Sequence, residues 1–421
     1  MRTDRQRACP FFSCKNEFEE SGGGAWRLAG GVWGNNCEKV IRSKAGKIIM
    51  LDNYKISPRQ FMMLVTLVTI GDSVLVLPAI SADLAKQDAW IAVMIGLVIG
   101  LGNVLLLIAV GKRYPNVSFF SFIDRLFGRV LGTMITLSFV WYTFFSASAH
   151  VLETGDFVGT YLLNDTPSIA IQLLLVILIM FGVRLGLQTV AYSAQIYFYT
   201  FFFLFVLLIL SLIPQADLSR LQPVMENGWK PIVAGAIPSV AFPFSELVIF
   251  LAILPYVSPI QKRMRHFLKG AFLGGMVLAI VIFMCILVLG ADQTARHMYP
   301  SYVLAKQIKI GTFIQRLEVI LAVVWFIAVN AKITIYSVFF QLGLRHVFRI
   351  QDMPVLTLPY MVMLLVMANI FTPNMVVYGS IISQYWPYYD FTYSIGLPVL
   401  MLIVYKWRSK LAGPQIHDTK Q

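Results

Sequence analysis

The chain has 421 residues, of which 58% are hydrophobic and only 13% are charged. Soluble globular domains carry roughly 25% charged residues, and no water-soluble fold hides this much apolar surface. The formal net charge of +13 does not indicate a nucleic-acid-binding protein, because the basic residues flank apolar runs instead of lining one surface. The composition therefore predicts an integral membrane protein whose basic residues face anionic lipid.

The first 49 residues form a polar leader with three of the four cysteines and no apolar stretch of signal-peptide length. A translation start at Met50, just ahead of the first apolar run, is favoured over a disordered cytoplasmic arm. The expected organisation is a leader (1–49), a membrane domain (50–410) and a cytoplasmic tail (411–421). The cysteines and the five histidines show no metal-ligand spacing, so we expect no metal, no disulfide and no cofactor.

Apolar runs of transmembrane length define the membrane domain, because a helix needs about 20 apolar residues to cross a bilayer. Ten such runs lie at 57–84, 88–110, 130–162, 167–183, 186–213, 232–256, 267–290, 316–344, 354–371 and 391–407. With both termini inside, the internal loops hold eleven Lys and Arg residues and the external loops hold seven. This excess predicts that both termini are cytoplasmic.

Three further segments, at 116–129, 291–308 and 376–391, lie between or beside the apolar runs. The first two have the spacing of amphipathic helices in the interface, although loops that cover the bundle are the favoured interpretation. The third is typical of an interfacial aromatic belt.

Two GxxxG pairs lie inside apolar runs, Gly96 with Gly100 and Gly270 with Gly274. Missing side chains let helix backbones approach closely. We expect both pairs to mediate packing inside the bundle.

Interruptions of a membrane helix mark candidate sites, because the freed backbone groups must be satisfied by protein or by a water-filled cavity. The first span has Gly71, Asp72 and Ser73 near its middle. The sixth span contains Pro238 and Pro243, and proline removes an N–H and clashes with the preceding turn. We therefore expect the sixth helix to break near its second proline.

The two interrupted spans stand five helices apart, as in inverted repeats that each place a broken first helix at a shared central site. The predicted fold class is an all-α integral membrane protein of about ten transmembrane helices, a 5+5 inverted repeat with broken helices 1 and 6, of amino acid permease type. Helix N-termini suit a carboxylate and C-terminal carbonyls suit an ammonium group, so an amino acid or similar zwitterion is the expected ligand. The alternative is a proline kink and a tolerated Gly-Asp turn without a ligand.

Charged side chains inside the spans are costly and therefore informative, at about 2.5–3.5 kcal/mol each on insertion scales. Asp72 and Glu246 lie beside the two breaks and are the leading candidates. Glu246 either accepts hydrogen bonds from freed N–H groups, which we favour, or binds a ligand cation. Glu153 and Asp156 lie in the outer half of the third span, where an external vestibule and simple solvation explain them equally well.

Lys332 lies in the eighth span. Sodium-coupled carriers of inverted-repeat architecture often bind the ion between the first and eighth helices, so Lys332 could replace it by pairing with Asp72 or with carbonyls of the first span. The alternative, which we favour, is that the ammonium group of Lys332 extends towards the cytoplasm and is not a fixed cation. Surface or interfacial positions are expected for His150, His266, His297 and His346.

Two of these segments carry a resemblance to a known family. The sequence "ISPRQFMMLVTLVTIGDSVLVLPA" (56–79) and the "FPFSE" of 242–246, followed by "LAILPYV", resemble the B subunit of nutrient germinant receptors of spore-forming Bacillales and Clostridia. That spore germination family belongs to the amino acid-polyamine-organocation superfamily. The resemblance covers residues from about 50 to about 410, and it implies a ten-helix permease-like protein in the inner membrane of the spore.

The resemblance also implies partners and a ligand site. The partners are the A and C receptor subunits, and the ligand is a small nutrient, an amino acid above the sugars and nucleosides. The implied ligand-binding residues, the last three chosen by membrane depth, are Gly71, Asp72, Ser73, Glu246, Phe242, Pro243, Phe244, Tyr142, Ser146 and Asn330.

Two functions remain open. A receptor subunit would bind the nutrient and pass the change to its partners, whereas an amino acid transporter would release it on the inside. Proton-coupled relatives in the superfamily often carry a lysine in the fifth span, and residues 186–213 contain none, which disfavours the transporter. No catalytic triad, phosphate loop or nucleotide motif is present, so we do not expect an enzyme.

Overall fold

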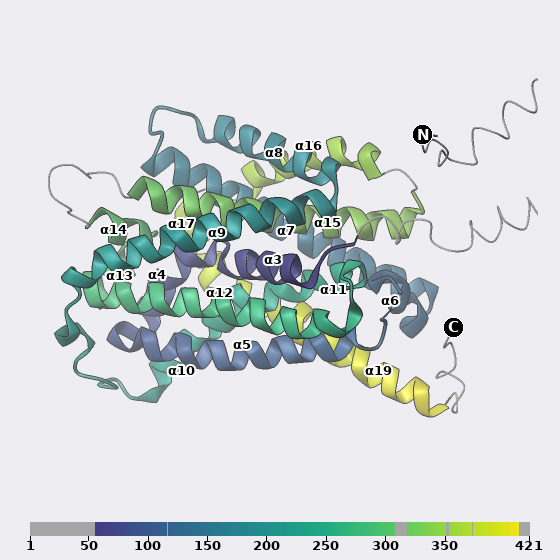
Figure 1. Cartoon of the computed structure of the whole chain (residues 1–421), viewed down its shortest axis with the longest axis horizontal. Helices are drawn as coiled ribbons and strands as arrows, with labels where there is room; N and C mark the ends of the chain where they lie inside the picture. The colour runs from purple at the N-terminus through teal and green to yellow at the C-terminus, as the bar shows by residue number, and fades with distance from the viewer. Residues whose placement is uncertain (1–54, 116, 308–317, 351–352, 373, 412–421) are drawn as a thin grey trace, which may run out of the picture. The chain divides into compact units, whose positions relative to one another are not determined.

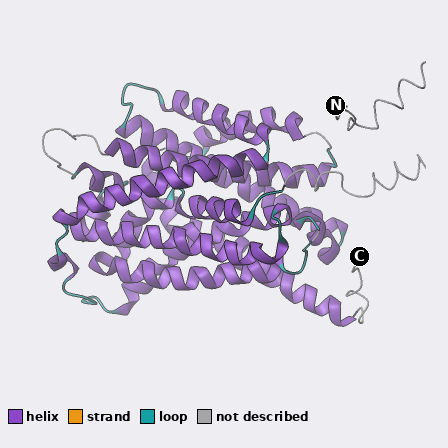
Figure 2. Ribbon diagram, viewed as in Figure 1, coloured by secondary structure: helices purple, strands orange, loops and turns teal. Residues whose placement is uncertain are grey.

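The computed structural model describes residues 55–115, 117–307, 318–350, 353–372 and 374–411. The predicted leader and nearly all of the predicted tail lie outside these residues. The described part consists of helices joined by loops, with one isolated parallel β-bridge between Ile56 and Val257 (Figure 2). The helical membrane fold predicted from composition is therefore confirmed.

The α-helices are α3 (Pro58–Ile70), α4 (Ser73–Ala85), α5 (Ala89–Gly111), α6 (Phe119–Phe127), α7 (Arg129–Tyr161), α8 (Ser168–Leu185), α9 (Leu187–Leu212), α10 (Trp229–Val240), α11 (Phe250–Ile253), α12 (Ile260–Leu289), α13 (Ala291–Arg296), α14 (Pro300–Lys306), α15 (Glu318–Phe348), α16 (Met353–Ile370), α17 (Met375–Gln384), α18 (Trp386–Phe391) and α19 (Leu397–Leu411). Short 3₁₀ or π segments are η1 (Lys86–Asp88), η2 (Ile213–Gln215), η3 (Leu218–Leu221), η4 (Ala241–Ser245), η5 (Glu246–Ile249), η6 (Leu254–Tyr256) and η7 (Thr392–Gly396). Each of the ten predicted apolar runs coincides with helix in its described part.

Within the described residues, seven helical segments are long and apolar enough to cross a membrane, or eight if one bent pair counts as a single span. One of them, Ser73–Gly111, contains the second half of the first predicted span and the whole second span. The first half of that first span is the shorter apolar helix α3. Helix α3 packs against α9 and α12, and α5 packs on α12, as the ribbon shows (Figure 1).

The first span breaks where the sequence predicts. Ser57 and Gln60 form a capping box that starts α3, and the helix ends at Gly71. Gly71 has φ +31° and ψ −127°, a conformation that side-chain-bearing residues rarely adopt. Helix α4 then starts at Ser73 with Asp72 as its N-cap residue.

The sixth span is interrupted at its second proline. Helix α10 ends at Val240, the π-helical segment η4 follows over Ala241–Ser245, and a 3₁₀ segment begins at Glu246. Pro243 lies inside η4, where its missing N–H removes a backbone hydrogen bond. The chain stays helical through the interruption, but the regular α-helical hydrogen bonding changes there.

Both GxxxG pairs pack inside the bundle, as predicted. A Cβ atom added at Gly96 would lie 2.5 Å from Cβ of Ser239, and one at Gly100 would collide with the ring of Phe244. A Cβ atom at Gly270 or Gly274 would collide with α3, which α12 contacts along its length. The glycines therefore hold α5 against α10 and η4, and α12 against α3.

The segments predicted to be internal gather at one end of the bundle. The N–H of Ile56 donates to the carbonyl of Tyr256 at 2.9 Å, and the guanidinium of Arg408 donates to the carbonyl of Arg125 at 3.0 Å. Helix α6 covers this end with its apolar side chains buried, whereas α13 and α14 lie at the opposite end (Figure 1). The favoured interpretation of segments 116–129 and 291–308 as covering loops is therefore wrong about their local structure, because most of their described residues are in short helices.

Candidate functional site

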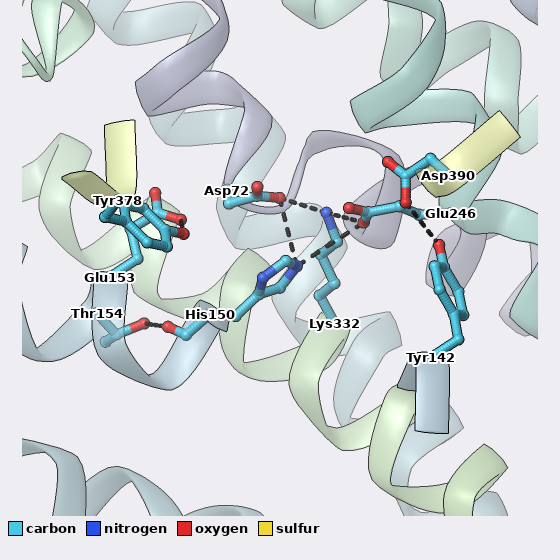
Figure 3. Close-up of polar contacts among 9 residues, drawn as sticks. All are labelled: Asp72, Tyr142, His150, Glu153, Thr154, Glu246, Lys332, Tyr378 and Asp390. Atoms are coloured by element: carbon cyan, nitrogen blue, oxygen red, sulfur yellow. Dashed lines mark hydrogen bonds and ion pairs between the residues drawn. The ribbon is translucent and has the colours of Figure 1, made fainter. Parts of the chain in front are cut away.

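A buried lysine lies between the two interrupted spans. Lys332 projects from α15 and is fully buried, and its Nζ contacts the carboxylates of both Asp72 and Glu246 (Figure 3). Asp72 follows the end of α3, and Glu246 follows η4 directly. The expected contact of Lys332 with Asp72 is therefore present, and extension towards the cytoplasm is ruled out by the burial of the ammonium group.

A histidine completes this group, which we call the central ion cluster (Asp72, His150, Glu246 and Lys332). Nε2 of His150 lies 3.7 Å from Oδ1 of Asp72 and 3.7 Å from Oε2 of Glu246. His150 is only 2% exposed. The prediction that it lies at the surface or interface is wrong, because α7 turns this side chain towards the two breaks.

A third carboxylate lies beside the cluster. Glu153 is 1% exposed, and the hydroxyl of Tyr378 donates to its Oε2 at 3.4 Å. Simple solvation, one of the two explanations expected for Glu153, is therefore wrong. Asp156, one helical turn further, is only partly buried and accepts a hydrogen bond from Tyr299 at 3.1 Å.

A cavity of about 10 Å³ opens between these groups, which is room for roughly one water molecule. Its polar wall consists of Asp72, Ser73, His150, Glu153 and Tyr378, and its apolar wall of Val76, Phe242, Ile382 and Trp386. The two breaks thus face one small cavity.

A second polar pair lies on the other side of Glu246. The hydroxyl of Tyr142 donates to Oδ1 of Asp390 at 2.9 Å, and both side chains are buried (Figure 3). The ring of Tyr142 stacks on Tyr393, with ring centroids 4.4 Å apart. Tyr142 therefore belongs to this pair and does not line the cavity.

The ten predicted ligand-binding residues divide into three groups. Asp72, Ser73 and Phe242 line the cavity. Gly71 lies at the break, where an added Cβ would be 2.5 Å from Cδ of Lys332. Outside the cavity wall are Tyr142, Ser146, Pro243, Phe244, Glu246 and Asn330.

Phe244 and Glu246 lie close to the cavity-lining Phe242 in the sequence, but neither lines the cavity. The ring of Phe244 fills the space beside Gly100 and Gly275 and is a packing residue. The carboxylate of Glu246 pairs with Lys332. In the described part of the chain it accepts no hydrogen bond from a freed backbone N–H, so the favoured expectation for Glu246 is wrong.

Sequence reasoning missed four polar or aromatic residues in and beside the site: His150, Tyr378, Trp386 and Asp390. His150 and Glu153 are three residues apart on α7 and share a helix face, a signal that could have been read. Tyr378 and Trp386 belong to the segment interpreted as an interfacial belt, yet both are buried. Their position depends on how α17 and α18 fold back, which no local pattern shows.

The chain matches the family model described as "Spore germination protein" over residues 55–376. It is 25% identical over 366 residues to spore germination protein KB of Bacillus subtilis, with 86% of this chain and 97% of that protein covered. The match includes both interrupted spans and most of the cavity wall.

The fold is similar to that of two transporters of known structure. MhsT in complex with L-phenylalanine aligns with a TM-score of 0.57 at 15% identity, covering 84% of this chain and 98% of that one. Mhp1, a nucleobase-cation-symport-1 family transporter in a closed conformation with bromovinylhydantoin bound, also aligns with a TM-score of 0.57, at 12% identity over 78% of this chain and 75% of that one. These likenesses confirm the predicted permease-like fold, and the family match shows that the chain belongs to the spore germination protein family.

Proposed function

We propose that this protein is the membrane-embedded subunit of a spore nutrient germinant receptor, which binds a small nutrient and triggers germination. The observation that carries the proposal is that the breaks of the first and sixth spans, in a chain of the spore germination family, face one buried cavity. Helix ends at such breaks offer free backbone groups to a ligand. An amino acid fits this chemistry best.

The cavity has room for about one water molecule, so a nutrient needs it to widen. A ligand in the cavity can be coupled to movement of the protein, because the cavity wall is built from five helical elements. Residues of α4, α7, η4, α17 and α18 contribute to it. Any ligand that enlarges the cavity must shift these segments relative to one another, and the shift is the signal passed on.

We propose that the A and C receptor subunits receive this signal, and that the protein lies in the inner membrane of the spore with both termini cytoplasmic. The gathering of the predicted internal loops at one end of the bundle supports their lying on one side of the membrane, and the excess of Lys and Arg in these loops supports the cytoplasmic side. The cavity-lining residues, together with Gly71 at the break, are the proposed nutrient site. Lys332 is the proposed fixed cation that keeps the two breaks together.

The proposal is tested by deleting the gene in a spore-forming host and following dipicolinate release from purified spores. The nutrient panel contains amino acids, sugars and nucleosides. We expect the response to particular nutrients to be lost and to return with the wild-type gene. Restoration with Gly71→Ala should raise the nutrient concentration needed, whereas Gly102→Ala, whose added Cβ would contact nothing within 4 Å, should behave as wild type. An unchanged panel would overturn the receptor proposal.

An amino acid transporter is the second candidate, favoured by the likeness to MhsT and Mhp1. The two functions differ in flux. A transporter accumulates labelled amino acid in proteoliposomes that contain this chain alone, whereas a receptor subunit binds without accumulation. Uptake that saturates, together with an unchanged germination panel, would establish the transporter.

A further inference from the structure

Buried negative charge exceeds buried positive charge around the cavity. Asp72, Glu153, Glu246 and Asp390 are each at most 9% exposed, and Lys332 is the buried lysine that faces them in the described part of the chain. Charges that are removed from water without a partner are strongly unfavourable. Additional positive charge is therefore expected in this region.

Three of the surrounding side chains are arranged as a set of ligands. One ligand atom each from Asp72, His150 and Glu153 lie within 4.8 Å of one another, and all three residues are buried. His150 and Glu153 share one face of α7, and Asp72 is held by the break between α3 and α4. The three line the same cavity, which is of a size for a single ion or water.

Three ligand atoms of His150 and Glu153 have no hydrogen-bond partner among the described residues. They are the two ring nitrogens of His150 and Oε1 of Glu153. Buried polar atoms without partners are rare in folded proteins and call for an explanation, such as a bound ion. The other carboxylate oxygen of Glu153 accepts a hydrogen bond from Tyr378, as an outer residue that orients a metal ligand would provide.

We propose that Asp72, His150 and Glu153 bind one divalent transition-metal ion, such as Zn²⁺ or Mn²⁺. One imidazole and two carboxylates form a mixed nitrogen and oxygen set, which suits these ions better than Ca²⁺ or Mg²⁺. Metal–ligand bonds are about 2.0–2.2 Å long, so the ligand atoms move slightly closer together around the ion. The three residues also belong to the proposed nutrient site, but ion binding is inferred and measured without a nutrient, so it does not depend on the proposed function.

Charge supports the same occupant. Asp72, Glu153, Glu246 and Asp390 contribute four negative charges and Lys332 one positive charge, so a divalent ion reduces the negative excess from three charges to one. Lys332 repels the ion, but its own charge is already shared by Asp72 and Glu246, which it contacts directly. The apolar wall with Phe242, Ile382 and Trp386 stays available for an organic ligand beside the ion.

The test uses the full chain purified in detergent, with its affinity tag removed and bound metal stripped with EDTA. Calorimetric titrations with ZnCl2, MnCl2, MgCl2 and CaCl2 measure affinity and stoichiometry. We expect saturable binding of one Zn²⁺ or Mn²⁺ per chain and much weaker binding of Mg²⁺ and Ca²⁺. The absence of saturable Zn²⁺ and Mn²⁺ binding would overturn the inference.

Matched variants on one helix locate the ion. Glu153→Gln and His150→Gln should each weaken binding by about 100-fold or more, because each removes a ligand. Asp156→Asn, which removes a carboxylate one turn away, should bind as wild type. Equal weakening by Asp156→Asn, or unchanged binding in the two ligand variants, would overturn the site.

A measurement on the wild-type chain keeps the test independent of variant folding. X-ray absorption at the zinc edge should show one imidazole among nitrogen and oxygen ligands. A spectrum with no imidazole, or with sulfur ligands, would contradict the assigned residues.

Discussion

The two broken spans are held in different ways on their two sides. Where they face α5 and α12, the broken spans pack against glycines. These glycines let α10, η4 and α3 approach so closely that an added methyl group would not fit. Where they face α15, the same two spans are joined by the ion pairs of the central ion cluster. One contact depends on shape, and the other depends on a cation between two carboxylates.

This difference indicates where the molecule can respond to a ligand. Close-packed contacts lose their energy over a fraction of an ångström and do not sense distant charge. Charge interactions in a buried environment are strong and extend further, so a ligand group beside Asp72 changes the balance at Lys332. We infer that the glycine contacts fix the broken spans and that the ion cluster is the part that changes.

The largest expected effect comes from removing the cation. Lys332→Met leaves Asp72 and Glu246 buried and facing each other without a counterion, at a cost of about 3–5 kcal/mol in the free energy of unfolding. Denaturing-detergent titration of the purified protein measures this change. Lys269→Met, at an exposed position on α12, is the control and should have little effect.

A second variant distinguishes lost charge from lost packing. Adding Asp72→Asn and Glu246→Gln to Lys332→Met removes the uncompensated charges and should recover part of the stability. Equal stability of Lys332→Met and wild type would contradict the role of the cluster.

The shape-dependent contact should give a smaller effect. Gly100→Ala introduces a Cβ atom that collides with the ring of Phe244, and such overpacking costs about 1–3 kcal/mol. Gly102→Ala lies on the same helix with nothing within 4 Å of the added Cβ. It should leave stability unchanged or raise it by up to about 1 kcal/mol, because alanine favours helix. Similar losses in both variants would refute close packing as the cause.

These contrasts also explain what the sequence could and could not predict. Gly71 and Pro243 act on their own backbone, so both breaks were predictable from local residue types. The Lys332 contact required the eighth helix to lie beside the first, which the resemblance to a known fold supplied. The spacing of His150 and Glu153 shows that they share a face of α7, but it does not show that this face is turned inwards, because that depends on the rotation of α7 within the bundle.

Asp390 illustrates the same limit at the end of the chain. It lies among aromatic residues that are typical of a membrane interface, yet it is fully buried and accepts a hydrogen bond from Tyr142. The residues next to Asp390 in the sequence suggest a membrane interface. Its burial instead depends on contacts with distant residues such as Tyr142, almost 250 positions away. Pairings at such separations are outside the reach of a single sequence without a template.

The smallest expected effect tests the polar part of the α3–α12 contact. The hydroxyl of Thr66 is shared between the carbonyl of Met62 in its own helix, at 2.9 Å, and the carbonyl of Gly270 in α12, at 3.1 Å. The hydroxyl of Thr69 donates within its own helix, to Val65 at 2.8 Å. Thr66→Val should cost about 0.6 kcal/mol, the average for a hydrogen bond between membrane helices, and Thr69→Val should cost less. The same detergent titration compares them. A larger loss for Thr69→Val would contradict this assignment.

The most direct measurement for the proposed nutrient site compares two phenylalanines of one π-helical segment. Phe242 lines the cavity, whereas Phe244 packs against the glycines of α5 and α12. Spores that carry Phe242→Leu or Phe244→Leu are compared for dipicolinate release over a range of nutrient concentrations, at matched protein levels. The account predicts a shifted concentration dependence for Phe242→Leu and a wild-type dependence for Phe244→Leu. A shift confined to Phe244→Leu, or none in Phe242→Leu, would contradict the placement of the nutrient in this cavity.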